Sequence, residues 1–201
     1  MRKLVFFIGP AGAGKTTLAK ALAHKRRAAF FDMDTLLRPA AEAIMTLSGL
    51  DPNDRDSPVY KTRCRDLGYR VTMDAALENV ELGNDAVVVG PFTKESADPA
   101  WLERELARIG ASVDNVDVKA AFVYLPEEEL YRQRIRKRGF EMDVWKLDNW
   151  SVFRKTLARR DIKWKLPTAS MVYFDNSGPL SNDKLGRLEQ FVYGGDIPEP
   201  V

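Results

Sequence analysis

The stretch Lys3–Ala23, KLVFFIGPAGAGKTTLAKALA, decides the fold. A short apolar run, Leu4–Ile8, leads into Gly9–Thr16 (GPAGAGKT), and apolar residues then recur at the spacing of one helix face. This is the pattern G-x-x-x-x-G-K-[ST] placed between a strand and a helix, which is the context that a phosphate-binding loop requires. The alternative is a chance glycine turn, but such a turn rarely has the correct strand and helix on either side. The stretch therefore predicts a phosphate-binding loop.

Each kind of residue in this loop has a physical role in holding a phosphate. Glycines let the backbone turn tightly, so that successive N–H groups point at one anion, and the following helix adds its positive N-terminal end. Lys15 supplies a point charge for the terminal phosphates, and the Thr16 hydroxyl is placed to coordinate Mg²⁺. We expect a nucleotide to be bound by Gly9, Gly12, Ala13, Gly14, Lys15, Thr16 and Thr17.

The composition excludes several classes of protein. The chain has 201 residues, 45% apolar and 30% charged, as in an ordinary globular domain, and its net charge of +2 indicates neither a nucleic-acid nor a membrane partner. No apolar run approaches the roughly 18 residues of a membrane span, and the N-terminal apolar stretch is too short for a signal peptide. One cysteine and one histidine exclude an internal disulfide and a cysteine- or histidine-rich metal site. We expect a cytoplasmic protein.

Two aspartates follow the second predicted strand, Ala28–Phe31. In parallel α/β sheets, ligands gather at the carboxyl ends of the strands, so Asp32 and Asp34 should face the phosphates held by the loop. The alternative is that they are turn or N-cap residues, because a helix is predicted to follow. Their position directly after a strand favours a functional role.

The third predicted strand, Ala86–Val89, is an all-apolar run of the kind found in a central parallel strand. It ends in Gly90-Pro91 and lacks the terminal aspartate that motor and transporter ATPases use to organise Mg²⁺ and water. This absence makes Asp32 the expected carboxylate partner of the metal. Gly90 would let a substrate approach the backbone closely.

Strands and helices alternate along the whole chain, which predicts a parallel sheet covered on both faces. Further strands are expected at Ala120–Leu125 and Met171–Phe174, and a helix that starts at Asp98-Pro99 should contribute a Trp and Leu stripe to the core. We therefore expect a single α/β domain over residues 1–201, with five parallel strands in a three-layer sandwich and a tail at 194–201.

A basic helix follows the fourth predicted strand. Its acidic start, basic end and closing Gly139 also describe a well-capped helix, but capping does not explain so many arginines. Arg134 and Arg138 are four residues apart and share a face, so they could clamp a polyphosphate together. The polar and aromatic segment Phe140–Asn149 is sized for a small lid, and we expect the lid to span about 134–160.

Other arginines could reach an acceptor. A long helix is predicted over Val59–Leu82, bent at Gly68, and Arg65 on it could be directed inward to bind the substrate. A second basic helix is expected after the polar segment Phe140–Asn149. It carries Arg154, Arg159 and Arg160 among Trp150, Phe153 and Leu157.

The chain resembles small P-loop kinases of the shikimate kinase and gluconate kinase type. It also resembles AAA family P-loop proteins related to zeta toxin and chloramphenicol phosphotransferase. The similarity spans most of the chain in order. The matching segments are GPAGAGKTT, FFDMD, AVVVGPF, RIRKR and DNSG.

The resemblance implies a role for each matching residue. Lys15 would bind the transferred phosphate, Thr16 and Asp32 would organise Mg²⁺, and Asp34 would hold the acceptor hydroxyl. Arg134 would stack on the adenine of ATP, and Arg138 would contact the transferred phosphoryl group. The base would be lined by Asn176, Ser177 and Gly178, and the acceptor side would include Asp34, Arg65, Gly90 and Pro91. Gly90-Pro91-Phe92 replaces the glycine triplet of shikimate kinase, which argues against shikimate.

The leading hypothesis is an ATP- and Mg²⁺-dependent kinase that phosphorylates a hydroxyl group of a small molecule, with Lys15, Asp34 and Arg138 as catalytic residues. A nucleoside monophosphate acceptor remains open, because the arginines described above could bind its phosphate. A non-catalytic ATP-binding switch or accessory ATPase is a further alternative. A GTPase is disfavoured, since no Asn-Lys-x-Asp motif follows a strand. The residues specify neither the acceptor nor the oligomeric state.

Overall fold

A five-stranded parallel sheet forms the centre of the protein, whose computed structural model describes residues 1–194. The strands are β1 (Lys3–Ile8), β2 (Ala29–Asp32), β3 (Ala86–Val89), β4 (Asp117–Tyr124) and β5 (Met171–Asp175), in the spatial order β2-β3-β1-β4-β5. The helices are α1 (Lys15–Arg26), α2 (Met33–Leu47), α3 (Pro58–Arg63), α4 (Arg65–Glu81), α5 (Trp101–Ala107), α6 (Glu128–Arg138), α7 (Val144–Asp148), α8 (Trp150–Phe153) and α9 (Asn182–Tyr193). Short 3-10 turns lie at η1 (Glu141–Asp143), η2 (Arg154–Leu157) and η3 (Thr168–Ser170).

Strand β1 lies in the middle of the sheet, between β3 and β4. Phe7 of β1 pairs with Val89 on one side and with Ala121 on the other. Every residue of β1 and β3 is buried, because helices cover both faces of the sheet and leave no polar side for these strands. The loop that follows β1 therefore emerges at the centre of the carboxyl edge.

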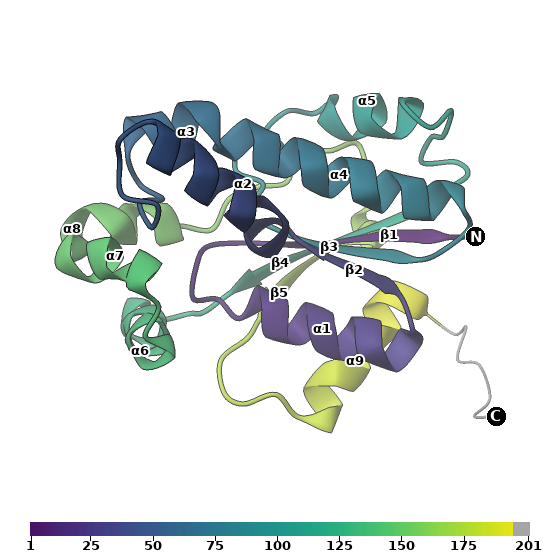
Figure 1. The fold of residues 1–201 in the computed structure, drawn as a ribbon. Helices are drawn as coiled ribbons and strands as arrows, with labels where there is room; N and C mark the ends of the chain where they lie inside the picture. Colours follow the sequence, from purple (N-terminus) through teal and green to yellow (C-terminus); the bar gives the residue numbers. More distant parts are fainter. Residues whose placement is uncertain (195–201) are drawn as a thin grey trace.

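Helices form a layer on each face of the sheet. Figure 1 shows α4 and α5 above it and α1 and α9 below it, while α6, α7 and α8 lie beyond its carboxyl edge. Side chains of β1 alternate between the layers: Leu4, Phe6 and Ile8 pack with α4 and α5, whereas Val5 and Phe7 pack with α1 and α9. The predicted three-layer α/β sandwich with five parallel strands is confirmed.

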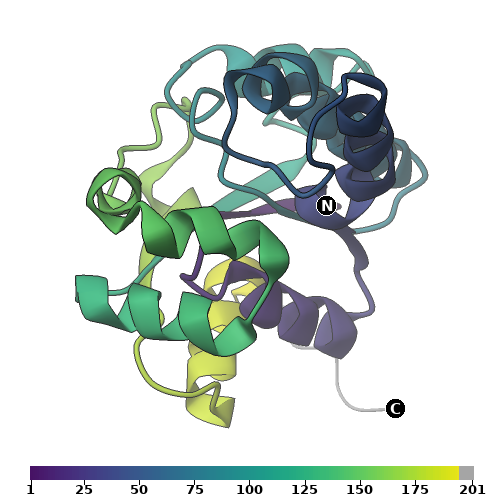
Figure 2. The ribbon, with the colours of Figure 1, turned by 60° about the vertical axis from the view of Figure 1, so that its left-hand side comes forward.

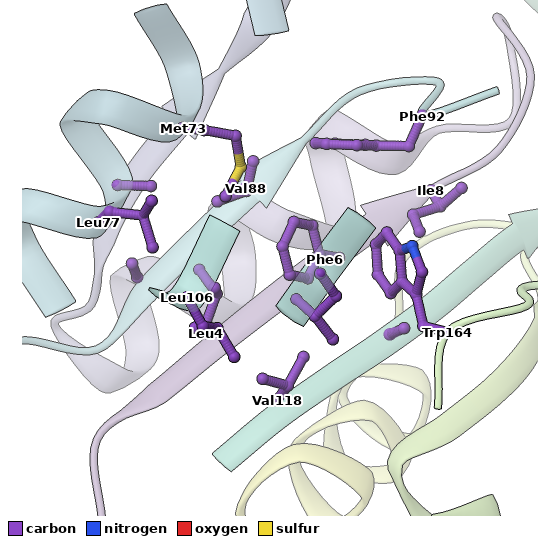
Figure 3. Close-up of a cluster of buried hydrophobic side chains, with 14 of the residues drawn as sticks. Leu4, Phe6, Ile8, Met73, Leu77, Val88, Phe92, Leu106, Val118 and Trp164 are labelled. Atoms are coloured by element: carbon purple, nitrogen blue, oxygen red, sulfur yellow. The ribbon is translucent and has the colours of Figure 1, made fainter. Parts of the chain in front are cut away.

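The upper core holds a cluster of aromatic rings. Phe6 and Trp164 lie side by side in Figure 3, with ring centroids 4.9 Å apart, and Trp164 stacks on Trp101 at 5.4 Å. The predicted Trp and Leu stripe of α5 is confirmed as core. Trp164 comes from the segment between η2 and β5, so this stacking fixes that segment against the sheet.

Two helix predictions are wrong in detail. The long helix breaks at Cys64, between α3 and α4, and not at Gly68. Gly68 lies inside α4 at a close approach to α2, where an added Cβ would be 2.7 Å from the Leu37 side chain. The second basic helix ends early, and Arg159 and Arg160 lie beyond η2 in a non-helical segment, which is held in part by a backbone hydrogen bond from Lys163 to Ser96. Of the predicted tail, the part after residue 194 lies outside the described residues.

Candidate functional site

The glycine-rich loop joins β1 to α1, and Gly14 is the N-cap of α1. Gly14 has φ 88°, a left-handed conformation that suits glycine, and it brings the first turn of α1 to the carboxyl edge of the sheet. The unpaired N–H groups of that turn point away from the helix, as in other helix N-termini that bind anions. The carbonyl oxygen of Ala13 accepts hydrogen bonds from Asn176 (2.8 Å) and Arg134 (3.2 Å), so the loop is held from outside.

Lys15 occupies the first position of α1, and its ammonium group donates to the Pro10 carbonyl at 2.8 Å. Burial lowers the pKa of Lys15 to about 8, against the opposing effect of the carboxylates of Asp34 and Asp32. The positive charges of Arg138 and Arg160 lower the pKa of Lys15 further. Two carboxylates and two guanidinium groups therefore lie close enough to Lys15 to affect its charge. A bound phosphate would favour the charged form of this lysine.

The end of β2 meets the start of α1 through one hydrogen bond. The Thr16 hydroxyl donates to a carboxylate oxygen of Asp32 at 2.8 Å, and the other oxygen of Asp32 accepts the backbone N–H of Asp34 at 3.0 Å. Asp32 is therefore the N-cap of α2 and also faces the loop, so both roles considered from the sequence coexist. Its side chain is buried, which keeps the pair in place.

The chemistry of this pair fits Mg²⁺. A hydroxyl and a carboxylate are the hard oxygen donors that Mg²⁺ prefers, and this ion usually takes one or two protein groups and fills its other positions with phosphate oxygens and water. Among residues 1–194 there is no group of three or more His, Cys, Asp or Glu side chains that could hold a metal by themselves. Thr16 and Asp32 therefore suit a metal that arrives with a nucleotide.

Asp34 is the second residue of α2 and lies close enough to Lys15 for the two side chains to affect each other's pKa. Asp34 is exposed to solvent in part, but the protein packed around its carboxylate removes some of its hydration, and this desolvation raises its pKa. The nearby Asp32 carboxylate adds to the rise. Lys15, Lys146 and Arg138 act in the opposite direction. A carboxylate that is accessible to a ligand and surrounded by these cations can accept a hydrogen bond from a hydroxyl group.

Arg134 on α6 and the residues after β5 come together beside the loop, while their expected contacts with adenine stay a prediction. The guanidinium of Arg134 donates to the carbonyl oxygens of Asn176 (2.7 Å) and Gly178 (3.2 Å). Lys184 was missed from the sequence. Its buried ammonium donates to Asn176 Oδ1 (3.2 Å) and to the Ser177 carbonyl (2.6 Å), so it braces the same turn.

Arg138, the last residue of α6, has a carboxylate partner that the sequence analysis missed. Both carboxylate oxygens of Asp143 accept hydrogen bonds from the Arg138 guanidinium, one of them at 2.6 Å from a terminal nitrogen. Lys146 donates to the same carboxylate at 3.0 Å. Asp143 is only 1% exposed, so this carboxylate depends on its two cations. An Asp in an exposed-looking polar segment carries no sequence signal of burial.

Arg65 is already neutralised by two carboxylates. It forms ion pairs with Glu95 (2.8 Å) and Asp66 (2.7 Å), and its guanidinium lies over the Tyr69 ring at 4.6 Å. Gly90 is buried beneath the ring of Phe92, where an added Cβ would lie 3.0 Å from a ring carbon. These contacts hold Arg65 and Gly90 within the fold, and a role for either residue in binding an acceptor stays a prediction.

Arg160 differs from Arg154 and Arg159 because it has a buried guanidinium nitrogen without a hydrogen-bond partner. It donates to the Pro91 carbonyl at 3.0 Å, its Nε is buried without a hydrogen-bond partner, and it forms no ion pair with a described carboxylate. Arg154 instead pairs with Glu128 at 3.4 Å, and Arg159 lies over the Tyr173 ring at 3.5 Å. Of these three arginines, Arg160 is the one whose charge contributes to the lowered pKa of Lys15.

No helix within residues 1–194 is long and apolar enough to span a membrane.

Comparisons with known proteins agree with this architecture. A family model described as AAA domain matches residues 4–160. A cytidylate kinase from Rhodospirillum rubrum is 33% identical over 131 residues, which cover 61% of this chain and 58% of that protein, so the match spans less than two thirds of this relative.

Solved structures share the fold at low sequence identity. A sugar kinase from Janibacter sp. HTCC2649 is 17% identical with a TM-score of 0.62, covering 95% of this chain and 94% of that one. A gluconokinase from Sinorhizobium meliloti 1021 is 16% identical with a TM-score of 0.52, covering 96% of this chain and 95% of that one. The likeness shows that this chain has the fold of small P-loop kinases.

Proposed function

The chain belongs to the AAA domain family, and we propose that it is an ATP-dependent kinase that transfers the γ-phosphoryl group to a hydroxyl group of a small molecule. The observation that carries the proposal is the meeting of Lys15, the hydrogen-bonded pair Thr16 and Asp32, and the accessible carboxylate of Asp34 at one edge of the sheet. A phosphate-binding loop alone would also suit a switch protein. The acid on the acceptor side is the addition that a phosphotransferase requires.

The transfer needs positioning and positive charge more than covalent help from the protein. The oxygen of the acceptor hydroxyl forms a bond to the γ-phosphorus, and Asp34 accepts the proton of that hydroxyl. The bond from that phosphorus to the bridging oxygen breaks, and its electron pair leaves with ADP. Lys15 and Arg138 stabilise the charge on the transferred group. Thr16 and Asp32 would hold Mg²⁺, which neutralises charge on phosphate oxygens when bound.

The nucleotide base would lie between Arg134 and the turn at 176–178. The hydrogen bonds of Arg134 lie in the plane of its guanidinium, so they leave the face of this group available to stack on adenine. Lys184 would keep the turn in its bound shape. The loop residues 9–17 would hold the phosphates in the same way as in other proteins with this motif.

The arginines favour a hydroxyl acceptor over a nucleoside monophosphate. The phosphate of a monophosphate is a dianion that is usually held by more than one guanidinium. Arg65, Arg154 and Arg159 are engaged elsewhere, which leaves Arg160 as the acceptor-side candidate. The similarity to a cytidylate kinase supports the nucleoside monophosphate kinase as the second candidate. An accessory ATPase would have no use for Asp34.

The test is the release of ADP from ATP and Mg²⁺ in the presence of a panel of sugars, sugar acids, amino alcohols and nucleoside monophosphates, including CMP. We expect one class of hydroxyl acceptor to raise ADP release above basal hydrolysis. Asp34→Asn should then lower the stimulated rate by about 100-fold or more while ATP still binds. Asp114→Asn, at an exposed position before β4, is the matched control. Stimulation by CMP alone would support the second candidate, and no stimulation by any acceptor would refute both.

A further inference from the structure

One buried carboxylate connects the residues beyond the carboxyl edge of the sheet. Asp143 lies in η1 between α6 and α7, and its two cationic partners, Arg138 and Lys146, come from those two helices. Figure 2 shows the segment α6–α8 in front of the carboxyl edge, opposite α2 and α3. Arg138 lies close enough to Lys15 to affect its pKa, so it is near the phosphate site while bound to Asp143.

Arg138 cannot leave Asp143 for a phosphoryl group without a consequence. If Arg138 were the only counter-ion of Asp143, its departure would strongly destabilise this carboxylate, which is 1% exposed and has little water to compensate its charge. Lys146 changes this balance. Its ammonium already bonds to one oxygen of Asp143 at 3.0 Å and would remain as the counter-ion.

Lys146 is held in place independently of Arg138. It donates to the Met142 carbonyl at 2.9 Å, and it lies 4.0 Å from Asp56 in the loop between α2 and α3. The same loop is joined to η1 by a hydrogen bond from Asn53 to Glu141 at 3.0 Å. The side chain of Lys146 is 12% exposed. The position of Lys146 is therefore set both by its own segment, η1–α7, and by the loop between α2 and α3.

We propose that Lys146 is a positioning residue that releases Arg138 from Asp143, so that Arg138 can contact the terminal phosphate of the nucleotide. Lys146 neutralises Asp143 in the state in which Arg138 has moved. Asp143 serves as the resting partner of Arg138 when no triphosphate is bound. The inference rests on the proposed contact between Arg138 and the transferred group.

Binding of two unreactive probes tests this role without an acceptor. The ATP analogue AMP-PNP has the terminal phosphoryl group and ADP lacks it, so the ratio of their dissociation constants reports contacts to that group. We expect Lys146→Met to reduce the preference for AMP-PNP over ADP by about tenfold in calorimetry with Mg²⁺, as Arg138→Met should. Lys155→Met, at an exposed position in η2, is the matched control and should leave the ratio unchanged.

Removal of the charge on Asp143 tests whether Lys146 acts through this carboxylate. The double variant Lys146→Met, Asp143→Asn should recover the preference for AMP-PNP, since a neutral amide needs no counter-ion. Lys146→Arg should retain it. A Lys146→Met protein with the wild-type ratio, or a double variant that recovers nothing while its thermal unfolding is normal, would overturn the inference. If the wild-type protein bound neither probe, the proposed function itself would fail, which is a different result.

Discussion

Replacement of Gly14 by alanine should separate two effects that act on the same loop. The left-handed φ of 88° strains any other residue. In addition, the new Cβ would lie 2.4 Å from Nδ2 of Asn176, the nitrogen that donates to the Ala13 carbonyl. The Asn176 amide must therefore move, and its hydrogen bond to the loop is lost.

The magnitude follows from these two effects. The left-handed backbone costs about 1–2 kcal/mol for a residue with a Cβ. Loss of the hydrogen bond from Asn176 costs about 1 kcal/mol. Gly14→Ala should thus lower the free energy of unfolding by about 2–3 kcal/mol. Asn176→Ala should lower it by about 1–2 kcal/mol, because this variant also loses the hydrogen bond from Lys184 to Asn176 Oδ1. The double variant keeps only the 3.2 Å contact of the new Cβ with the flexible Arg134 side chain, and it has lost the bond from Asn176 to Ala13 only once. Its loss should therefore be smaller than the sum of the two single losses by about 1 kcal/mol.

Urea unfolding followed by circular dichroism measures all three variants. Gly49→Ala is the control for backbone strain alone, because Gly49 has φ 69° and no atom within 4 Å of an added Cβ. It should lose about 1–2 kcal/mol. If Gly14→Ala and Asn176→Ala are additive within about 0.3 kcal/mol, the account of the Gly14 contact is wrong. Equal losses for Gly14→Ala and Gly49→Ala would refute it as well.

Three further substitutions test separate parts of the structure. Thr16→Val removes the hydroxyl bonded to Asp32, so AMP-PNP affinity should fall about tenfold with Mg²⁺ and stay unchanged with EDTA in calorimetry; an equal loss in EDTA would contradict the metal role. Tyr69→Phe leaves the buried N–H of Phe92 unpaired and should cost about 1–3 kcal/mol in urea unfolding, whereas a loss below about 0.5 kcal/mol would speak against that bond. Phe6→Ala should cost about 3–5 kcal/mol by the same assay, and the exposed Val152→Ala less than about 0.5 kcal/mol; similar losses would contradict the described core.

The local patterns of the sequence predicted the strands and the loop well. A continuous apolar run such as Leu4–Ile8 has one favourable solution next to a glycine loop and a helix, which is a buried parallel strand. Asp32 was found for the same reason, since a residue directly after a strand lies at the ligand-binding edge whatever the strand order. The β4 strand nevertheless begins at Asp117, three residues earlier than expected, because Lys3 and Asp117 pair in the register of β1 and β4.

The partners of the charged residues were not predictable. Arg138 and Arg134 have the same residue type and share a helix face, yet one binds a buried carboxylate and the other binds backbone carbonyls. Arg65 was expected to be directed to a substrate, but it is paired with Glu95, thirty residues away. A charged side chain can satisfy itself with many partners, and only the packing of distant segments selects one.

The sequence by itself determined the α/β class, the phosphate-binding loop and the acids after β2, because each depends on residues that are neighbours along the chain. Tertiary structure alone decided the central place of β1, the break at Cys64, and the grouping of Asp143 with Arg138 and Lys146. These features depend on which segments bury one another's surface. A carboxylate acquires its counter-ions only when the chain has folded around it and removed it from water.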